Sequence, residues 1–211
     1  MSNELLILGS RSPRRLELLA HLLPRFRIRV LAAADEQEAG FSGRNSIGEI
    51  LSQLAGIART KNDTVFQQVD STLRGCGILS ADTVVIVPNR ENSLTVLGKP
   101  DGPDWEQTTR VWFQSYFSGK SHQVATALCL RTRQNELLER QVLTTIQFCE
   151  IPPDMIDWYL STREPLGKAG AYALQGAGSC FVTAIHGSPS NVIGLPLLET
   201  RELLQQARLL P

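Results

Sequence analysis

The stretch LLILGSRSPRRLELL, residues 5–19, decides the fold class, because an apolar run passes through a short polar loop into a helical pattern. The run at residues 5–8 is typical of a short buried strand. Ser12 followed by Pro13 is the pattern of a helix N-cap with proline at the first helical position. It predicts a helix that ends near Pro24. A strand that leads directly into a helix indicates an α/β protein.

The loop in this stretch concentrates positive charge. Its polar side chains are Ser10, Arg11, Ser12, Arg14 and Arg15. The unpaired N–H groups and the dipole of a helix N-terminus favour an anion. Hydroxyls and guanidinium groups also match phosphate oxygens well. The alternative is that the arginines pair with Glu17 or with solvent. The loop is not a Walker A motif, because G-x-x-x-x-G-K-[ST] is absent.

Outward from this stretch, helical and strand-like patterns alternate along the chain. Strands are predicted at 26–31, 78–87, 94–97, 122–131, 137–150 and 180–185. Helices are predicted at 46–61, behind the capping box Ser46–Glu49, and at 105–117, 152–160 and 197–209. Residues 62–77 are expected to be irregular and exposed, and 167–178 to form a glycine-rich loop. The pattern predicts one α/β domain over residues 1–211, with a mixed twisted sheet, flanking helices and two lobes around a cleft.

Composition narrows the class of protein. The chain has 211 residues, 42% of them hydrophobic, with 21 Lys+Arg against 21 Asp+Glu. Zero net charge disfavours a nucleic-acid binder, which usually shows a basic excess. No apolar stretch approaches the length needed to span a bilayer, and nothing signals secretion, so we expect a cytoplasmic protein without a membrane partner. The four cysteines are widely spaced, which predicts reduced and mostly buried thiols. The three histidines are scattered, so oxygen-bound Mg²⁺ or Mn²⁺ is a better expectation than zinc.

Asp82 interrupts the apolar run ILSADTVVIV, residues 78–87. A carboxylate inside a buried strand is costly unless it is paired, protonated or bound to a metal. Asp82 is therefore a candidate metal ligand or a candidate general base for water. The alternative is a carboxylate at a strand end that caps a neighbouring turn.

Further polar residues stand in contexts that suit a ligand. Lys99 lies in LGKPDG, and Lys168 lies between glycines that permit close approach of the backbone. Lys61 ends the predicted second helix, where a cation also suits the helix dipole. The amide of Gln175 can read the edge of a nucleotide base. The acidic pair at 35–36 reads as a solvated loop.

Seven segments, in this order, resemble the signature blocks of the Maf family of nucleoside triphosphate pyrophosphatases, the septum-formation protein family. The segments are SRSPRRLELL, ADEQE, ADTVV, LGKPDG, SGKSHQVAT, EPLGKAGAYALQG and GSPSNVIGLPL. The resemblance runs from Leu6 to about Leu204. It implies a Maf/ITPase-like fold and an enzyme that uses Mg²⁺ or Mn²⁺ to cleave nucleoside triphosphates between the α and β phosphates. It also implies a role in cleaning the nucleotide pool, linked to arrest of cell division.

The resemblance assigns roles to individual residues. Asp82 matches the proton acceptor and, with Glu36, would hold the metal. Arg14, Thr83 and Gln175 match positions that accompany dTTP and UTP as substrates. The residues expected to bind the triphosphate are Ser10, Ser12, Arg14, Arg15, Lys61, Lys99 and Lys168.

The chain departs from the family pattern in two motifs and has longer segments than usual around residues 70–77 and 88–95, and alternatives to its activity remain. Gly167 stands where the family usually has Asp, and Ser188-Pro189-Ser190 replaces a usual Asp-Tyr-x. The first departure is expected to weaken a pairing with Lys168 or to move the metal preference. One alternative is a nucleotide-binding regulator of septum formation that acts through protein contact. Another is a pyrophosphatase for a modified purine such as 7-methyl-GTP, whose branch has Trp in place of Arg14. The aromatic helix at 105–117 suggests a homodimer interface.

Overall fold

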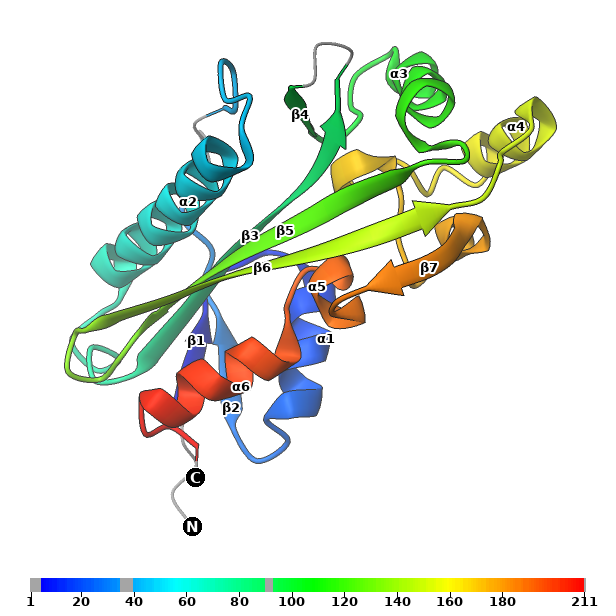
Figure 1. Ribbon diagram of the computed structural model, residues 1–211. Helices are drawn as coiled ribbons and strands as arrows, with labels where there is room; N and C mark the ends of the chain where they lie inside the picture. Colours follow the sequence, from blue (N-terminus) through cyan, green and yellow to red (C-terminus); the bar gives the residue numbers. More distant parts are fainter. Residues whose placement is uncertain (1–4, 35–39, 90–92, 211) are drawn as a thin grey trace.

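One mixed sheet organises the protein in the computed structural model, which describes residues 5–34, 40–89 and 93–210. The strands are β1 (Leu5–Leu8), β2 (Arg27–Val30), β3 (Gly77–Pro88), β4 (Leu94–Leu97), β5 (Ser121–Arg131), β6 (Leu137–Phe148) and β7 (Val182–His186). Their order is β2-β1-β3-β5-β6-β7, and β4 pairs with β3. The strands β2, β1 and β3 are parallel, and the remaining pairs are antiparallel (Figure 1). The predicted α/β class with a mixed sheet is confirmed.

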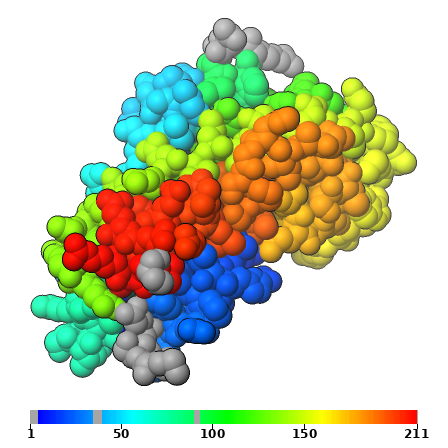
Figure 2. Space-filling model, turned by 60° about the horizontal axis from the view of Figure 1, so that its bottom comes forward, coloured from blue at the N-terminus to red at the C-terminus, as the bar shows by residue number. Residues whose placement is uncertain are grey.

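Helices cover both faces of the long strands β3, β5 and β6. They are α1 (Pro13–Leu22), α2 (Ile47–Gln68), α3 (Trp105–Trp112), α4 (Pro153–Ser161), α5 (Pro189–Ile193) and α6 (Leu197–Gln206). In Figure 1, α2 lies along one face, while α1, α5 and α6 lie on the other, and α3 and α4 sit near one end of the strands. Figure 2 shows the C-terminal segments (red and orange) beside the N-terminal α1 (blue), so the two ends of the chain build one layer.

Side chains of β3 alternate between the two layers, which explains its unbroken apolar run. Val84 and Ile86 pack with Ile50 of α2, whereas Leu79 and Ala81 pack with residues of α1 and α6. Because both faces are covered, the strand needs apolar residues at nearly every position. An aromatic core fills the end near α3 and α4; it contains Phe113, Phe117, His122, Phe148, Tyr159, Tyr172 and Phe181. Burial lowers the pKa of His122 to about 3, so this histidine is a neutral core residue.

The second helix is longer than the sequence predicts. It continues to Gln68 instead of ending near Lys61, so the expectation of irregular structure from residue 62 is wrong for 62–68. Asn62 is fully buried, and its Nδ2 donates to the carbonyl oxygens of Ile78 (2.9 Å) and Cys129 (3.0 Å). Partners from distant strands therefore satisfy a polar stretch that looks like a helix end in the sequence.

The aromatic helix also differs from its prediction. Residues 105–112 are α-helical, and Phe113–Phe117 forms a π-helical turn. Phe113 and Phe117 are fully buried in the aromatic core, because the wider turn faces β5 and α4 with its rings. Asp104 makes no side-chain hydrogen bond at the N-cap. The short helix α5 begins in the second departing segment, runs on to Ile193 and is absent from the sequence prediction.

The burial of the cysteines agrees only in part with the prediction of mostly buried thiols. All four cysteines are unpaired, but just one of them, Cys129, is buried and Cys180 is exposed. Across the described ranges, no helix has the length and apolar character to cross a membrane.

Candidate functional site

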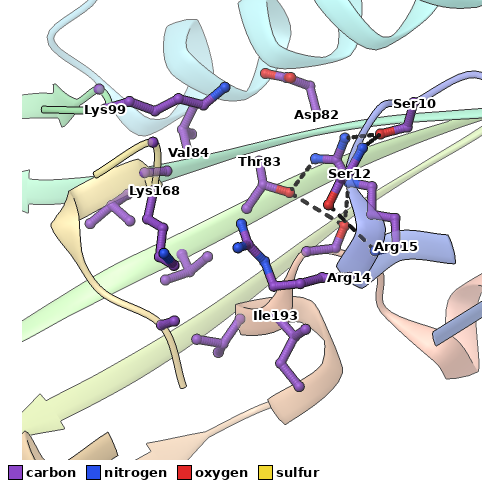
Figure 3. A pocket seen from close by; sticks show the side chains of 18 of the residues that line it. Ser10, Ser12, Arg14, Arg15, Asp82, Thr83, Val84, Lys99, Lys168 and Ile193 are labelled. Atoms are coloured by element: carbon purple, nitrogen blue, oxygen red, sulfur yellow. Dashed lines mark hydrogen bonds between the residues drawn. The ribbon is translucent and has the colours of Figure 1, made fainter. Parts of the chain in front are cut away.

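A gap at one edge of β3 creates the site. Pairing between β1 and β3 ends at Leu79, and pairing between β4 and β3 begins at Val85. Among the described strands, none pairs with this edge between those two points. A cavity of about 600 Å³ opens there (Figure 3), within the size range of ligand sites in proteins.

Nearly all sequence-predicted site residues line this one cavity. They are Ser10, Ser12, Arg14, Arg15, Lys61, Asp82, Thr83, Lys99, Lys168 and Gln175, together with Arg11. Glu36 lies outside the described residues. The topology thus brings together the helix start, the middle of β3, the end of β4 and the glycine-rich loop.

Asp82 lies in the middle of β3 and forms an ion pair with Lys61 of α2. Lys61 Nζ is 2.5 Å from Asp82 Oδ1, and the side chains are only 15% and 10% exposed. The alternative of a turn-capping carboxylate at a strand end does not hold, because β3 runs on to Pro88. Lys61 is inside α2 and not at its end, so the helix dipole does not account for its position.

Arg15 joins the strand edge to both ends of the chain. Its guanidinium donates to Ser10 Oγ (3.2 Å), Thr83 Oγ1 (3.0 Å) and two carbonyls, those of Ala81 and Gly194 (2.8 Å each). The Ala81 carbonyl accepts from Arg15 along the stretch of β3 whose β1/β4 edge has no described strand, although β5 pairs with β3 on the other side, so Arg15 supplies a donor at the open edge. The structure therefore places the guanidinium assigned to triphosphate in contact with four protein acceptors.

Arg14 and Lys168 approach each other across the cavity. The Arg14 side chain extends into the cavity toward Lys168 (Figure 3), and no hydrogen bond or ion pair of Arg14 occurs within the described residues. Burial lowers the pKa of Lys168, and the positive charge of Arg14 lowers it further. Two cations that repel each other around a cavity form a favourable place for an anion.

Gly167 is the first departure from the family pattern. Because residue 167 is not Asp, this position places no carboxylate beside Arg14 and Lys168. Gly167 has a φ of +70°, and a Cβ there would meet no atom within 4 Å. Lys168 Nζ instead donates to the main-chain carbonyl of Glu164 at 2.6 Å. The lysine is therefore held by a neutral main-chain acceptor.

Lys99 and Gln175 are exposed and reach the cavity from its rim. Lys99 follows β4 and runs toward the side on which Asp82 lies (Figure 3). Gln175 stands between the 3₁₀ helix Ala169–Ala171, inside the predicted glycine-rich loop, and the 3₁₀ helix Ala177–Phe181, which extends past that loop into the start of the predicted strand. Both side chains are placed to contact a ligand after it has entered.

The cavity has both charged and apolar lining. Its described cationic residues are Arg11, Arg14, Arg15, Lys61, Lys99 and Lys168, and its described carboxylates are Asp82 and Asp101. Apolar lining comes from Val85, Val124, Tyr172, Leu174, Val192 and Ile193. This combination suits a ligand that has both a polyanionic part and a less polar part.

Sequence reasoning missed the hydrogen-bond network behind the cavity. Thr83 Oγ1 bonds to Thr126 Oγ1 (2.9 Å), which donates to the carbonyl of Asn191. The buried Asn191 Nδ2 donates to Val124 O and Thr144 Oγ1, both at 3.0 Å, and thereby fixes α5 to β5 and β6. Ser188 caps α5 by accepting from Asn191 N, a role that an Asp also fills, so the second departure keeps the local helix start.

Glu164 is a second residue that sequence reasoning passed over. Its carboxylate accepts hydrogen bonds from the loop that carries Gln175. The signal was present, because a Glu directly before a Pro-x-Gly-Lys loop is a half-buried acid within a quoted block. In this block, EPLGKAGAYALQG, roles are assigned from the sequence only to Lys168 and Gln175.

The donor set fits a metal ion that is shared with substrate. In the parts of the chain that the structure describes, no three His, Cys, Asp or Glu side chains cluster as a metal cage. Mg²⁺ in enzymes is commonly held by one or two carboxylates together with substrate phosphates and water. Asp82 offers such a hard oxygen donor inside a phosphate-sized cationic cavity.

Comparisons with known proteins agree with this geometry. A dTTP/UTP pyrophosphatase from Anaeromyxobacter dehalogenans is 40% identical over 206 residues, which cover 96% of this chain and 93% of that protein. A dTTP/UTP pyrophosphatase from a Shewanella species is 38% identical over 210 residues, which cover 96% and 97%. The solved structure of a HAM1 protein from Coxiella burnetii shares the fold, with a TM-score of 0.52 at 11% identity over 96% and 99% of the two chains. The family model of Maf-like proteins matches residues 5–207. This chain therefore belongs to the Maf-like protein family.

Proposed function

We propose that this protein hydrolyses dTTP and UTP at the α–β phosphate bond, releasing the nucleoside monophosphate and pyrophosphate. The observation that carries the proposal is the Asp82–Lys61 pair in the same cavity as the cationic helix start at residues 10–15. The relatives that share 38–40% of its residues are named for this activity.

In the proposed mechanism, Asp82 orients the attacking water and accepts its proton. The water oxygen bonds to the α-phosphorus, the bond from this phosphorus to the bridging oxygen breaks, and pyrophosphate leaves with the bond's electron pair. Lys61 holds the Asp82 carboxylate in place through their 2.5 Å contact. Arg14, Lys99 and Lys168 stabilise the negative charge that builds up on the phosphate oxygens.

A divalent cation completes the proposed site. Asp82 would hold Mg²⁺ or Mn²⁺ with the substrate, and Glu36, from the family resemblance, would be its second carboxylate. When bound, the cation would supply Lewis-acid stabilisation of the phosphate oxygens.

Base selection is proposed to rest on Arg14, Thr83 and Gln175. Gln175 forms no hydrogen bond within the described residues, so its amide is available to pair with a base edge. The Thr83 hydroxyl is already bonded to Arg15 and Thr126. Thr83 would therefore influence base selection indirectly, by fixing the positions of these two side chains.

Pyrophosphate release from a panel of nucleotides tests the proposal. The panel contains dTTP, UTP, dCTP, dGTP and 7-methyl-GTP, each with Mg²⁺, with Mn²⁺ and with a chelator. We expect release from dTTP and UTP that requires the cation. Preference for 7-methyl-GTP would favour the modified-purine alternative. Nucleotide binding without any release would favour the regulator of septum formation.

Other properties stay predictions from the sequence. These are a single domain over residues 1–211, a cytoplasmic location, a homodimer, the absence of a nucleic-acid partner and a link to arrest of cell division. The continuous seven-stranded sheet supports the single domain.

A further inference from the structure

The carboxylate of Glu164 accepts hydrogen bonds from the far end of the loop that follows it, residues 165–176. Glu164 Oε1 accepts from Gly178 N (2.9 Å) and from the hydroxyl of Tyr159 (3.0 Å), and Oε2 accepts from Ala177 N (2.8 Å). Both carboxylate oxygens are therefore used, and the bonds to an ionised acceptor are of the stronger kind. The loop between these bonded ends spans residues 165–176.

This loop carries two of the residues that line the cavity. Lys168 and Gln175 both lie between Glu164 and its partners at 177 and 178. The main-chain carbonyl of Glu164 also accepts from Lys168 Nζ at 2.6 Å. Glu164 thus holds Lys168 through its main-chain carbonyl and holds residues 177 and 178, which follow Gln175, through its side chain.

Close packing next to Gln175 makes the contact specific. A Cβ on Gly176 would lie 2.0 Å from Glu164 Oε2, so any larger residue at 176 displaces the carboxylate. The middle of the loop has a contact of its own, because Gly170 N donates to Gly98 O at 2.9 Å, while the single proton of the Tyr159 hydroxyl is shared between Glu164 Oε1 and Ala171 O (3.2 Å). The end that bears Gln175 therefore depends on Glu164 most directly.

We infer that Glu164 is a positioning residue for substrate selection, which aligns Gln175 and Lys168 without touching the nucleotide. The inference rests on the proposed function for its substrate. A hydrogen-bonded readout of a base requires a fixed orientation of the amide, so a loosened loop loses discrimination before it loses chemistry. Asp82 and Lys61 lie on β3 and α2, outside this loop, and a change of the Glu164 side chain keeps the main-chain carbonyl that holds Lys168 Nζ, so the chemical step is expected to survive.

The first experiment replaces Glu164 by Gln, which keeps the size but turns one acceptor into a donor that faces an N–H. We expect KM for dTTP to rise about tenfold and its preference over dGTP to fall by about the same factor, while kcat changes less than about threefold. Glu202→Gln, the same change on the exposed face of α6, is the matched control and is expected to match the wild type. Tyr159→Phe removes one of the three donors and is expected to give a smaller shift in KM.

A double-mutant cycle separates positioning from general stability. If Glu164 acts through Gln175, then Gln175→Ala raises KM less in the Glu164→Gln protein than in the wild type. Gly176→Ala, which displaces the carboxylate but leaves Glu164 in the sequence, is expected to reproduce the loss of preference and to replace Glu164→Gln if that variant does not fold. Additive effects on KM, or a variant with lowered Tm and unchanged preference, overturn the inference.

The same cycle distinguishes the inference from the proposed function. If the wild type releases no pyrophosphate from the panel, the proposed function fails, and the cycle is then measured as the Kd of dTTP by calorimetry. Coupling between positions 164 and 175 in Kd supports the positioning role, and additivity in Kd overturns it.

Discussion

Two ionic contacts join the same turn of α2 to the sheet, and they differ in their surroundings, since one lies among protein contacts and the other lines a cavity. Arg131 of β5 bonds to Asn62 Oδ1 (3.0 Å), to Asn135 Oδ1 (2.6 Å) and to Asp63, and it covers the ring of Phe66. One position earlier on α2, Lys61 bonds to Asp82 at the wall of the cavity.

The difference separates a structural contact from a functional one. Around Arg131 nearly every polar atom has a protein partner, so the cluster ties β5 to α2 and leaves little for a ligand. Around Lys61 and Asp82 the protein arranges several cations and leaves a space of about 600 Å³ between them. A space bordered by several cations marks the site, because an anionic ligand can enter it.

The largest expected effect is on turnover, from Asp82→Asn. The amide keeps the shape of the carboxylate but is a poor proton acceptor, so we expect kcat to fall about 10³-fold. Pyrophosphate release from dTTP measures it, with Asp154→Asn, an exposed carboxylate of α4 outside the cavity, as the control expected to stay near wild type. A normal rate for Asp82→Asn would remove Asp82 from its catalytic role.

Arg131→Met is expected to lower stability and leave the activity of the folded protein unchanged. It leaves Asn62 and Asn135 without their shared donor, at a cost of about 2 kcal/mol in the free energy of unfolding. Urea unfolding measures the loss, and Arg201→Met on the exposed face of α6 serves as the control. A fall in kcat per folded molecule would show that Arg131 also serves catalysis and would contradict its assignment as a structural contact, distinct from the Lys61–Asp82 pair.

The neighbouring arginines of the helix start repeat the comparison on a smaller scale. Arg15→Ala removes the donor of the Ala81 carbonyl and of Thr83, so we expect it to cost about 1–2 kcal/mol of stability. Arg14→Ala is expected to change stability by less than about 0.5 kcal/mol and to raise KM for dTTP. Thermal unfolding and KM, measured on both variants, check the pair; equal losses of stability would show that Arg14 is also structural.

The smallest effect is expected at Gly167. Asp and Asn both tolerate the positive φ found there, so they isolate the charge. Gly167→Asp would place a carboxylate beside Lys168, raise the pKa of that lysine and increase KM about threefold at low salt, with less effect at high salt. Gly167→Asn should have a KM close to that of the wild type, and a similar rise in both variants would point to strain instead of charge.

Local sequence predicted most elements because their signals are short-range. The N-cap of α1 at Ser12 and the capping box Ser46–Glu49 of α2 form as the residue types require. The apolar run of β3 gave the central strand for the same reason. The polar residue Asp82 within this apolar run indicates a candidate site from the sequence alone.

The sequence by itself determined the α/β class, the family resemblance and the residues that gather at the cavity, since these depend on residue type and order. Tertiary structure decided what each of them contacts. Asn62 keeps α2 helical because Ile78 and Cys129 lie beside it. Arg15 binds the edge of β3, whereas Arg14 extends into the cavity. Glu164 clamps a loop whose partners lie 13 and 14 residues farther along the chain. Hydrogen bonds and burial depend on neighbours that only folding brings together, so two adjacent arginines with the same chemistry acquire different environments.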